Sequence, residues 1–272
     1  MKKKFTFSLV FVLLFAATGL VADEGRGGIL TSEMELADDV LENTSSLELW
    51  RIFDLGESVY MDGSILSEFS TADQLFGVSP AATLVLADTV RLGSEFFFDY
   101  FVDEDELEVS QSFHLGLYGQ RGPFRGDLRG KVWTDFVDQY ELSPRARGFI
   151  TIEEDGLGVE IGQALEWAYF YDDSDEYSED VVKADSSVKI SLAEGLRPYL
   201  LGELRHEWFQ SEHDTATWSQ EWTYSNSLFI EAGLSPEERD FTGYASVEIP
   251  LFSEEDSSTD PVFGLGVRVN LF

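Results

Sequence analysis

The chain has 272 residues, of which 52 are acidic and 18 are basic, so its formal net charge is −34, and it contains no cysteine. This excess of negative charge excludes nucleic acid as a natural partner, because the phosphate backbone would be repelled. Without cysteine there is no disulfide scaffold, so the fold must be held by hydrogen bonds and packing alone.

The amino terminus is predicted to be a secretory signal peptide. A basic run at 2–4 is followed by an apolar stretch at 5–21, and acidic residues begin at Asp23. This is the order of a charged region, an apolar core and a cleavage site. We expect cleavage after Ala22, with Gly19 as the alternative, and a membrane anchor is less favoured because the apolar stretch is short and interrupted. Removal of this segment would take away three lysines and no acid, which leaves a net charge of about −37.

Residues 23–45 are predicted to form a periplasmic or plugging segment that stands apart from the rest of the chain. Ser32 and Glu35 have the spacing of a capping box, in which two side chains bond backbone N–H groups at the start of a helix. A short helix and a disordered segment both remain compatible with this stretch.

From residue 46 onward the sequence is predicted to form antiparallel strands. The clearest segment is 157–171, where Leu157, Val159 and Ile161 alternate with polar or small residues such as Glu160. A period of two is typical of a strand with one apolar and one polar face. The same alternation predicts ten strands, near 92–102, 106–118, 124–138, 146–154, 157–171, 181–192, 196–210, 219–234, 240–252 and 262–272. Two more, at 46–55 and 80–88, would give twelve, with 56–79 as a long outer loop or an extra hairpin.

The strands are better suited to a membrane barrel than to a soluble sandwich. Many reach the ~9–11 residues that a tilted strand needs to cross a bilayer. The connections also alternate, because longer and mostly acidic segments are separated by short turns such as Asp155-Gly156, a type I′ hairpin signal. The longer segments are 139–145, 172–180, 211–218 and 253–261.

Aromatic residues are predicted to form a girdle at the outer end of the strands. An amphipathic ring at headgroup depth explains such a position, whereas a soluble core would not need them all at one end. The predicted girdle residues are Trp167, Tyr169, Trp208, Trp222 and Tyr224.

On these features the chain resembles the porin-like β-barrel proteins of Gram-negative outer membranes, without matching a specific family. The resemblance covers most of the mature chain and includes its ending, where Val267, Val269 and Leu271 alternate before Phe272. In that class such an ending is read by the barrel-assembly machinery, although here the apolar positions run one step out of phase with Phe272. The resemblance implies an all-β, up-and-down transmembrane barrel over 46–272, with about twelve strands or ten. It also implies a place in the outer membrane, in contact with lipid and lipopolysaccharide.

The inward faces of these strands are predicted to line a lumen with charges of both signs. We expect a small channel for hydrophilic and mainly cationic solutes, whereas a salt-bridged, non-conducting barrel that anchors or adheres is the alternative. The predicted lining residues are Glu108, Arg125, Arg129, Lys131, Glu160, Glu166, Lys189, Glu203, Arg205 and Glu207.

Neither an enzyme nor a cofactor is predicted. A serine hydrolase needs a histidine beside its nucleophile, and His213 near Ser211 is the one plausible pair, in a loop where such neighbours arise by chance. The acidic loop 172–180 could hold divalent cations through carboxylate oxygens, but it lacks the spacing of a calcium loop. We therefore expect a solvated acidic loop that could bridge through divalent cations to lipopolysaccharide, and no dedicated metal site.

Overall fold

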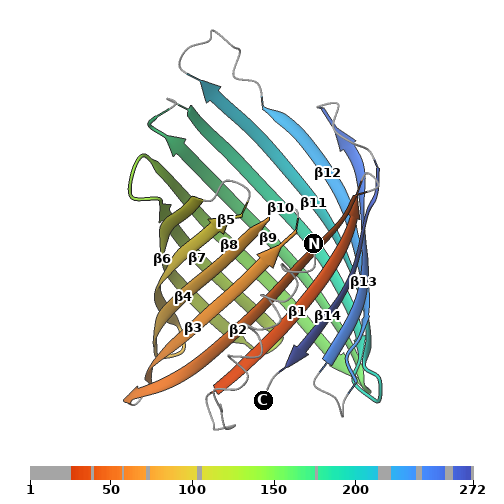
Figure 1. The fold of residues 1–272 in the computed structure, drawn as a ribbon. Coiled ribbons are helices and arrows are strands. Elements are labelled where there is room, and N and C mark those ends of the chain that lie inside the picture. The colour runs from red at the N-terminus through yellow and green to blue at the C-terminus, as the bar shows by residue number, and fades with distance from the viewer. Residues whose placement is uncertain are drawn as a thin grey trace.

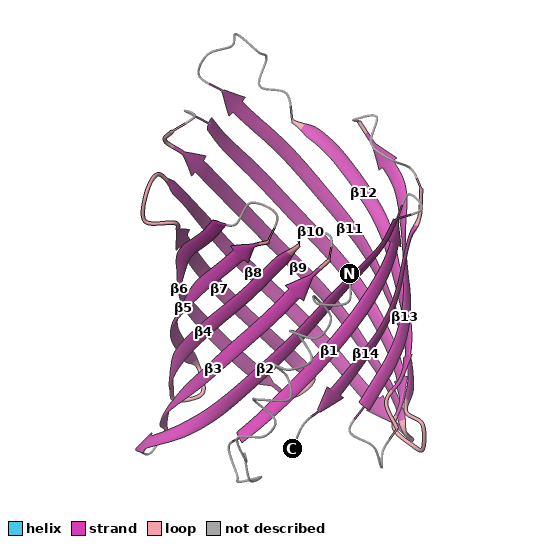
Figure 2. Ribbon diagram, in the orientation of Figure 1, coloured by secondary structure: helices cyan, strands magenta, loops and turns pink. Residues whose placement is uncertain are grey.

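The structure is a computed structural model, and it describes residues 26–37, 40–56, 58–71, 74–102, 106–174, 177–213, 222–236, 241–254 and 260–270. In this part of the chain the regular elements are β-strands, which are all antiparallel to their neighbours (Figure 2). They are β1 (Arg26–Ala37), β2 (Val40–Gly56), β3 (Val59–Ser70), β4 (Leu75–Leu86), β5 (Val90–Phe101), β6 (Glu106–Arg121), β7 (Phe124–Thr134), β8 (Gln139–Glu154), β9 (Leu157–Asp172), β10 (Tyr177–Leu192), β11 (Pro198–His213), β12 (Thr223–Leu234), β13 (Phe241–Ser253) and β14 (Val262–Asn270).

The strands close into one barrel. Each strand pairs with the next along the chain, and β1 pairs with β14 to complete the ring. In this closing pair Ile29 lies opposite Asn270 and Leu36 lies opposite Phe263. Figure 1 shows the strands tilted around a common axis, with β1 and β14 side by side. Closure leaves no unpaired edge, which a strand-built protein in a bilayer requires.

The barrel has fourteen strands, so the expectation of twelve or ten was too low. The two strands beyond the predicted twelve are β1 and β3. Strand β3 comes from 56–79, so of the two alternatives for that segment the hairpin is correct and the long loop is wrong. A larger strand number gives a wider barrel, because diameter grows roughly in proportion to it.

The amino-terminal segment corrects a second expectation. Residues 26–37 form β1 and 40–56 form β2, so most of the predicted periplasmic or plugging segment 23–45 belongs to the barrel wall. The S-x-x-E pattern does not cap a helix here, since Ser32 and Glu35 lie within β1 and their backbones pair with β14 and β2. The predicted signal peptide lies outside the described residues.

The connections follow the predicted up-and-down order. One end of the barrel carries the connections at 57–58, 87–89, 122–123, 155–156, 193–197 and 235–240, and the other end carries 38–39, 71–74, 102–105, 135–138, 173–176, 214–222 and 254–261. Asp155 and Gly156 have φ of 49° and 80°, and Gly195 has φ of 65°. Positive φ at both central residues is the geometry of the predicted type I′ turn. The predicted loop 139–145 is wrong, because these residues belong to β8 and the connection lies at 135–138. The predicted loop 172–180 shortens to 173–176, because β10 begins earlier than expected.

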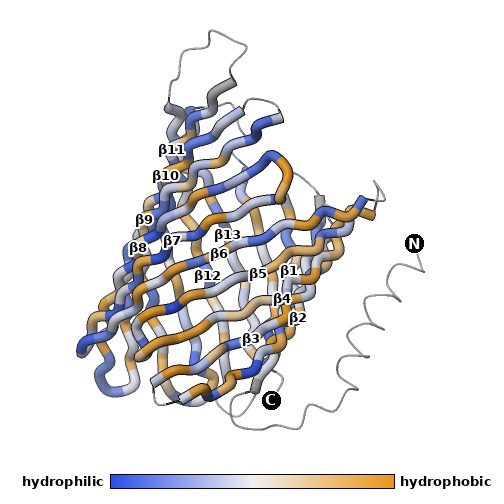
Figure 3. The backbone as a smooth tube through the Cα atoms, turned by 90° about the vertical axis from the view of Figure 1, so that its left-hand side faces the viewer, coloured by the Kyte–Doolittle hydropathy of each residue, from blue (hydrophilic) through white to orange (hydrophobic). Residues whose placement is uncertain are grey.

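Large apolar side chains lie on the outside of the barrel. About half of the surface is exposed at Leu115, Leu117, Leu128 and Leu165. Among the large apolar side chains that the structure describes, Leu47 and Val85 are buried. Figure 3 shows hydrophobic and hydrophilic residues alternating along the strands. No described helix is long and apolar enough to cross a membrane.

Candidate functional site

Ion pairs identify the inner face of the barrel wall. Arg125 on β7 reaches Glu160 on β9 (Nη2–Oε2, 3.0 Å), and Arg205 on β11 reaches Glu248 on β13 (Nη1–Oε2, 2.7 Å). Each of these ion pairs spans an intervening strand. Side chains converge on the concave face of a curved sheet, so these four residues lie on the inside of the barrel. Because side chains alternate along a strand, the paired registers then assign a face to the remaining residues.

All ten predicted lining residues have this inward register. Glu203 and Glu207 lie on β11 with Arg205 between them, and Lys189 lies on β10 near Tyr199. Lys131 lies opposite His114, and Glu166 lies opposite Arg145. That these side chains border a conducting lumen stays a prediction.

The acidic and basic groups pair most closely on the wall formed by β10–β13. Arg205 contacts Glu203 (Nε–Oε1, 2.6 Å) as well as Glu248, and Lys183 contacts Glu207 (Nζ–Oε2, 2.9 Å). Ser227 also donates a hydrogen bond to Glu248. All of these charged side chains keep some exposure, so they are solvated groups on an inner surface and not a dry core.

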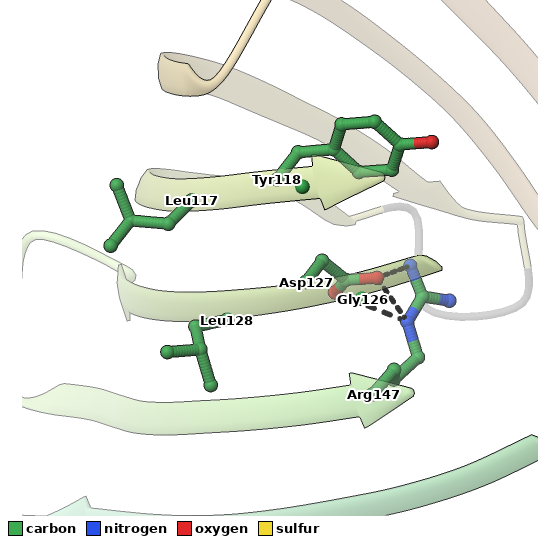
Figure 4. A pocket seen from close by; sticks show the side chains of 7 residues that line it. Leu117, Tyr118, Gly126, Asp127, Leu128 and Arg147 are labelled. Atoms are coloured by element: carbon green, nitrogen blue, oxygen red, sulfur yellow. Dashed lines mark hydrogen bonds and ion pairs between the residues drawn. The ribbon is translucent and has the colours of Figure 1, made fainter. Parts of the chain in front are cut away.

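A cavity of about 600 Å³ lies on the opposite wall, in the half nearer the short turns. Its lining contains five arginines and two aspartates. Arg147 and Asp127 form a two-point ion pair, with Nε–Oδ2 and Nη2–Oδ2 distances of 2.9 Å each. Figure 4 shows this pair beside Tyr118, with Leu117 and Leu128 pointing to the other side of the sheet. The charged groups of the cavity are Arg91, Arg125, Arg129, Arg145, Arg147, Asp62 and Asp127.

The interpretation of the sequence missed part of this cavity. Arg145 was assigned to a loop at 139–145, but it lies within β8, and Asp62 was assigned to a loop or hairpin and lies within β3. Pro144 made the loop the natural interpretation, since proline cannot donate to a sheet ladder. The alternation of Arg145, Arg147 and Phe149 with Ala146 and Gly148 was the signal that could have extended the strand.

The predicted girdle residues gather near the outer loops on the outward face. Trp208 and Tyr224 are adjacent across β11 and β12, with ring centroids 5.2 Å apart, and Trp167 and Tyr169 are 6.5 Å apart on β9. Trp167 Nε1 donates to Asp180 Oδ1 at 2.8 Å. Trp222 precedes β12 and exposes 45% of its surface.

The predicted assembly signal lies only partly in the described chain. Val267 and Val269 belong to β14, and Val267 is outward and exposed. Leu271 and Phe272 lie outside the described residues. No position in the part of the chain that the structure describes groups three or more metal-binding side chains. His213 ends β11, and its side chain is outside the described part.

Comparison with known proteins shows the fold without naming a family. No protein-family model matches the chain, and no curated protein sequence matches it. Among solved structures, it is similar to OmpT, an outer membrane protein of Vibrio cholerae, with a TM-score of 0.57 and 11% identity over 93% of this chain and 99% of that one. It is also similar to an outer membrane channel from Pseudomonas putida F1, with a TM-score of 0.53 and 10% identity over 92% and 97% of the two chains. The chain therefore has the fold of bacterial outer-membrane β-barrels, and its apolar outer surface agrees with the predicted outer-membrane location.

Proposed function

We propose that the protein is a porin-like channel of the bacterial outer membrane, through which small hydrophilic solutes diffuse with a preference for cations. The observation that carries this proposal is the solvated, charged inner wall of a closed fourteen-stranded barrel. Barrels of about eight strands are filled by their own side chains, whereas barrels of about 16–18 strands hold an aqueous channel. Fourteen strands lie nearer the second group.

The preference for cations rests on an excess of inward carboxylates. On the wall formed by β1–β3, no described basic side chain has the inward register. A ring or wall of carboxylates concentrates cations and repels anions at close range. The inward acids of these strands are Glu33, Glu35, Glu42, Glu48, Asp54, Asp62 and Glu68.

Conductance in planar lipid bilayers tests the proposal. Purified protein, shown to be folded by heat-modifiable migration on SDS gels, is expected to give stepwise conductance in KCl, and its reversal potential in a salt gradient should have the sign of cation selectivity. A folded protein that conducts no ions would reject the channel and favour the non-conducting structural or adhesive barrel. Anion selectivity would reject the stated preference.

The proposed function includes no catalytic step. A hydrolase that used His213 would lose its activity in the His213→Ala variant, whereas a channel would keep its conductance. We expect this variant to conduct as the unchanged protein does. An esterase or protease activity that disappears with His213 would contradict the proposal.

A further inference from the structure

Two arginines of the inner face lie opposite each other across β7 and β8. The register places Arg129 directly opposite Arg145. Like charges at directly opposed positions of a sheet destabilise it. Neither guanidinium forms an ion pair with another described residue, although Glu166 is the register partner of Arg145 on its other side. Glu166 and Asp127 attract Arg145, and Glu95 attracts Arg129. None of these carboxylates forms an ion pair with either guanidinium, so the repulsion between the two arginines is only partly offset.

Their unused donors strengthen this observation. The Nε atoms of both Arg129 and Arg145 are buried and have no hydrogen-bond partner in the described structure. A buried donor without a partner destabilises the folded protein. These buried Nε atoms cannot themselves meet a solute, but both side chains line the cavity, and the two Nη groups of a guanidinium present donors in a planar fork that fits an oxyanion.

The neighbouring side chains hold further arginines around the same cavity. Arg147 is fixed by Asp127, and Arg125 is fixed by Glu160 and lies 4.6 Å from the centre of the Phe149 ring. Arg91 lies 5.3 Å from the ring centre of Tyr118. These contacts orient the positive charges before any ligand arrives, so little ordering has to accompany binding.

We propose that this arginine-lined cavity is a binding site for a small oxyanion, such as a phosphate or carboxylate group of a solute, with Arg129 and Arg145 as its principal ligands. The cavity of about 600 Å³ has room for a small solute, and its two aspartates leave an excess of positive charge among its lining groups. The site rests on the proposed channel and refines it, because a passing solute that carries an oxyanion would be held on this wall while the rest of the lining attracts cations.

Titration with inorganic phosphate tests the site in the folded channel. Phosphate is expected to reduce the KCl conductance in a saturable manner. The half-blocking concentration should rise by about tenfold or more in Arg129→Gln and in Arg145→Gln, since each variant removes charge-assisted hydrogen bonds to the anion. Arg129→Lys should also weaken the block, because an ammonium keeps the charge and loses the fork.

Arg121→Gln is the matched control, because Arg121 ends β6 on the outward register and does not line the cavity. Its half-blocking concentration should equal that of the unchanged protein. Equal block in all variants, or conductance that phosphate does not alter, would overturn the site while the channel stands. Calorimetric titration of phosphate into the folded barrel in detergent measures binding independently of conductance. Binding that depends on Arg129 and Arg145 without any conductance would support the site and reject the channel.

Discussion

At the scale of single residues, one carboxylate organises the connection between β7 and β8. Oδ1 of Asp135 accepts backbone hydrogen bonds from Val137 at 3.0 Å, Asp138 at 3.2 Å and Gln139 at 2.9 Å. Partial burial opposes ionisation, but these backbone donors prevail and hold the pKa of Asp135 below its usual value. The charged form is therefore favoured in the folded loop.

We expect Asp135→Ala to destabilise the barrel by about 1 kcal/mol, the usual net contribution of a hydrogen bond. Asp135→Asn should cost less, because the amide oxygen can still accept. Since the folded pKa is below the unfolded one, the stabilisation by the charge is present above pH ~4 and is lost as pH falls through the folded pKa. Urea-induced unfolding in lipid vesicles at pH 7 and at pH 3 measures both effects. If the difference in unfolding free energy between the unchanged protein and Asp135→Ala is the same at both pH values, the charge of Asp135 does not contribute to stability.

At the scale of strands, aromatic rings on the inner face lie over glycines of neighbouring strands. The Tyr244 ring on β13 occupies the space where a Cβ atom of Gly266 on β14 would lie. A side chain at position 266 would therefore force the ring away, and overpacking of this kind costs about 1–3 kcal/mol. Gly243 on β13 faces outward, and no atom lies within 4 Å of the position that its Cβ atom would occupy.

This contrast gives a matched pair of substitutions in the same pair of strands. Gly266→Ala is expected to lower the free energy of unfolding by about 1–3 kcal/mol, and Gly243→Ala should change it by less than about 0.5 kcal/mol. Both variants lose one glycine, so the change in unfolded-chain entropy is shared. Equilibrium unfolding in vesicles, followed by tryptophan fluorescence, distinguishes them. Equal effects would show that the ring does not depend on Gly266.

The alternation of apolar and polar residues predicted the class of fold and the inward face of the predicted lining residues. It did not predict the full extent of β1, β4 and β8, because β4 and β8 contain prolines and β1 contains a capping pattern. Pro80 and Pro144 lie inside β4 and β8, where they keep their partners on one side, Ile65 and Gly130. Pairing on the other side lapses at both prolines, as expected for a residue without an N–H donor. A single strand therefore looked like a loop followed by a shorter strand.

The role of β1 follows from the same correction and can be tested. Deletion of residues 26–37 would expose two strand edges, on β2 and β14, whose backbone groups would have no partner in a bilayer. We expect this variant to fail to form a heat-modifiable barrel. A plugging segment would behave in the opposite way, because its loss would leave a folded barrel with larger conductance. Leu30→Val with Met34→Leu keeps the alternation of β1 and should fold normally.

At the scale of the whole molecule, closure of the barrel determines which charges meet. Arg129 and Arg145 are sixteen positions apart in sequence but directly opposed in the sheet, and Glu248 meets Arg205 from two strands away. Alternation predicts that such residues face inward, but their encounters depend on register, which a local pattern does not specify. This is why the inward face of these residues could be predicted from the sequence and the arginine-lined cavity could not.

The opposed charges of the two walls lead to a prediction for the complete channel. Free aspartates and glutamates lose their charge near pH ~4, whereas arginine stays charged at all accessible pH values. Acidification should therefore neutralise carboxylates on the wall formed by β1–β3, whereas the five arginines of the cavity keep their positive charge. We expect the reversal potential in a KCl gradient to indicate cation selectivity at pH 7 and to move toward anion selectivity as the pH is lowered. The Arg129→Gln, Arg145→Gln double variant should shift less toward anions at the same pH, because two of the remaining positive charges are gone. A reversal potential that does not respond to pH would mean that the ions pass without sensing the inner wall.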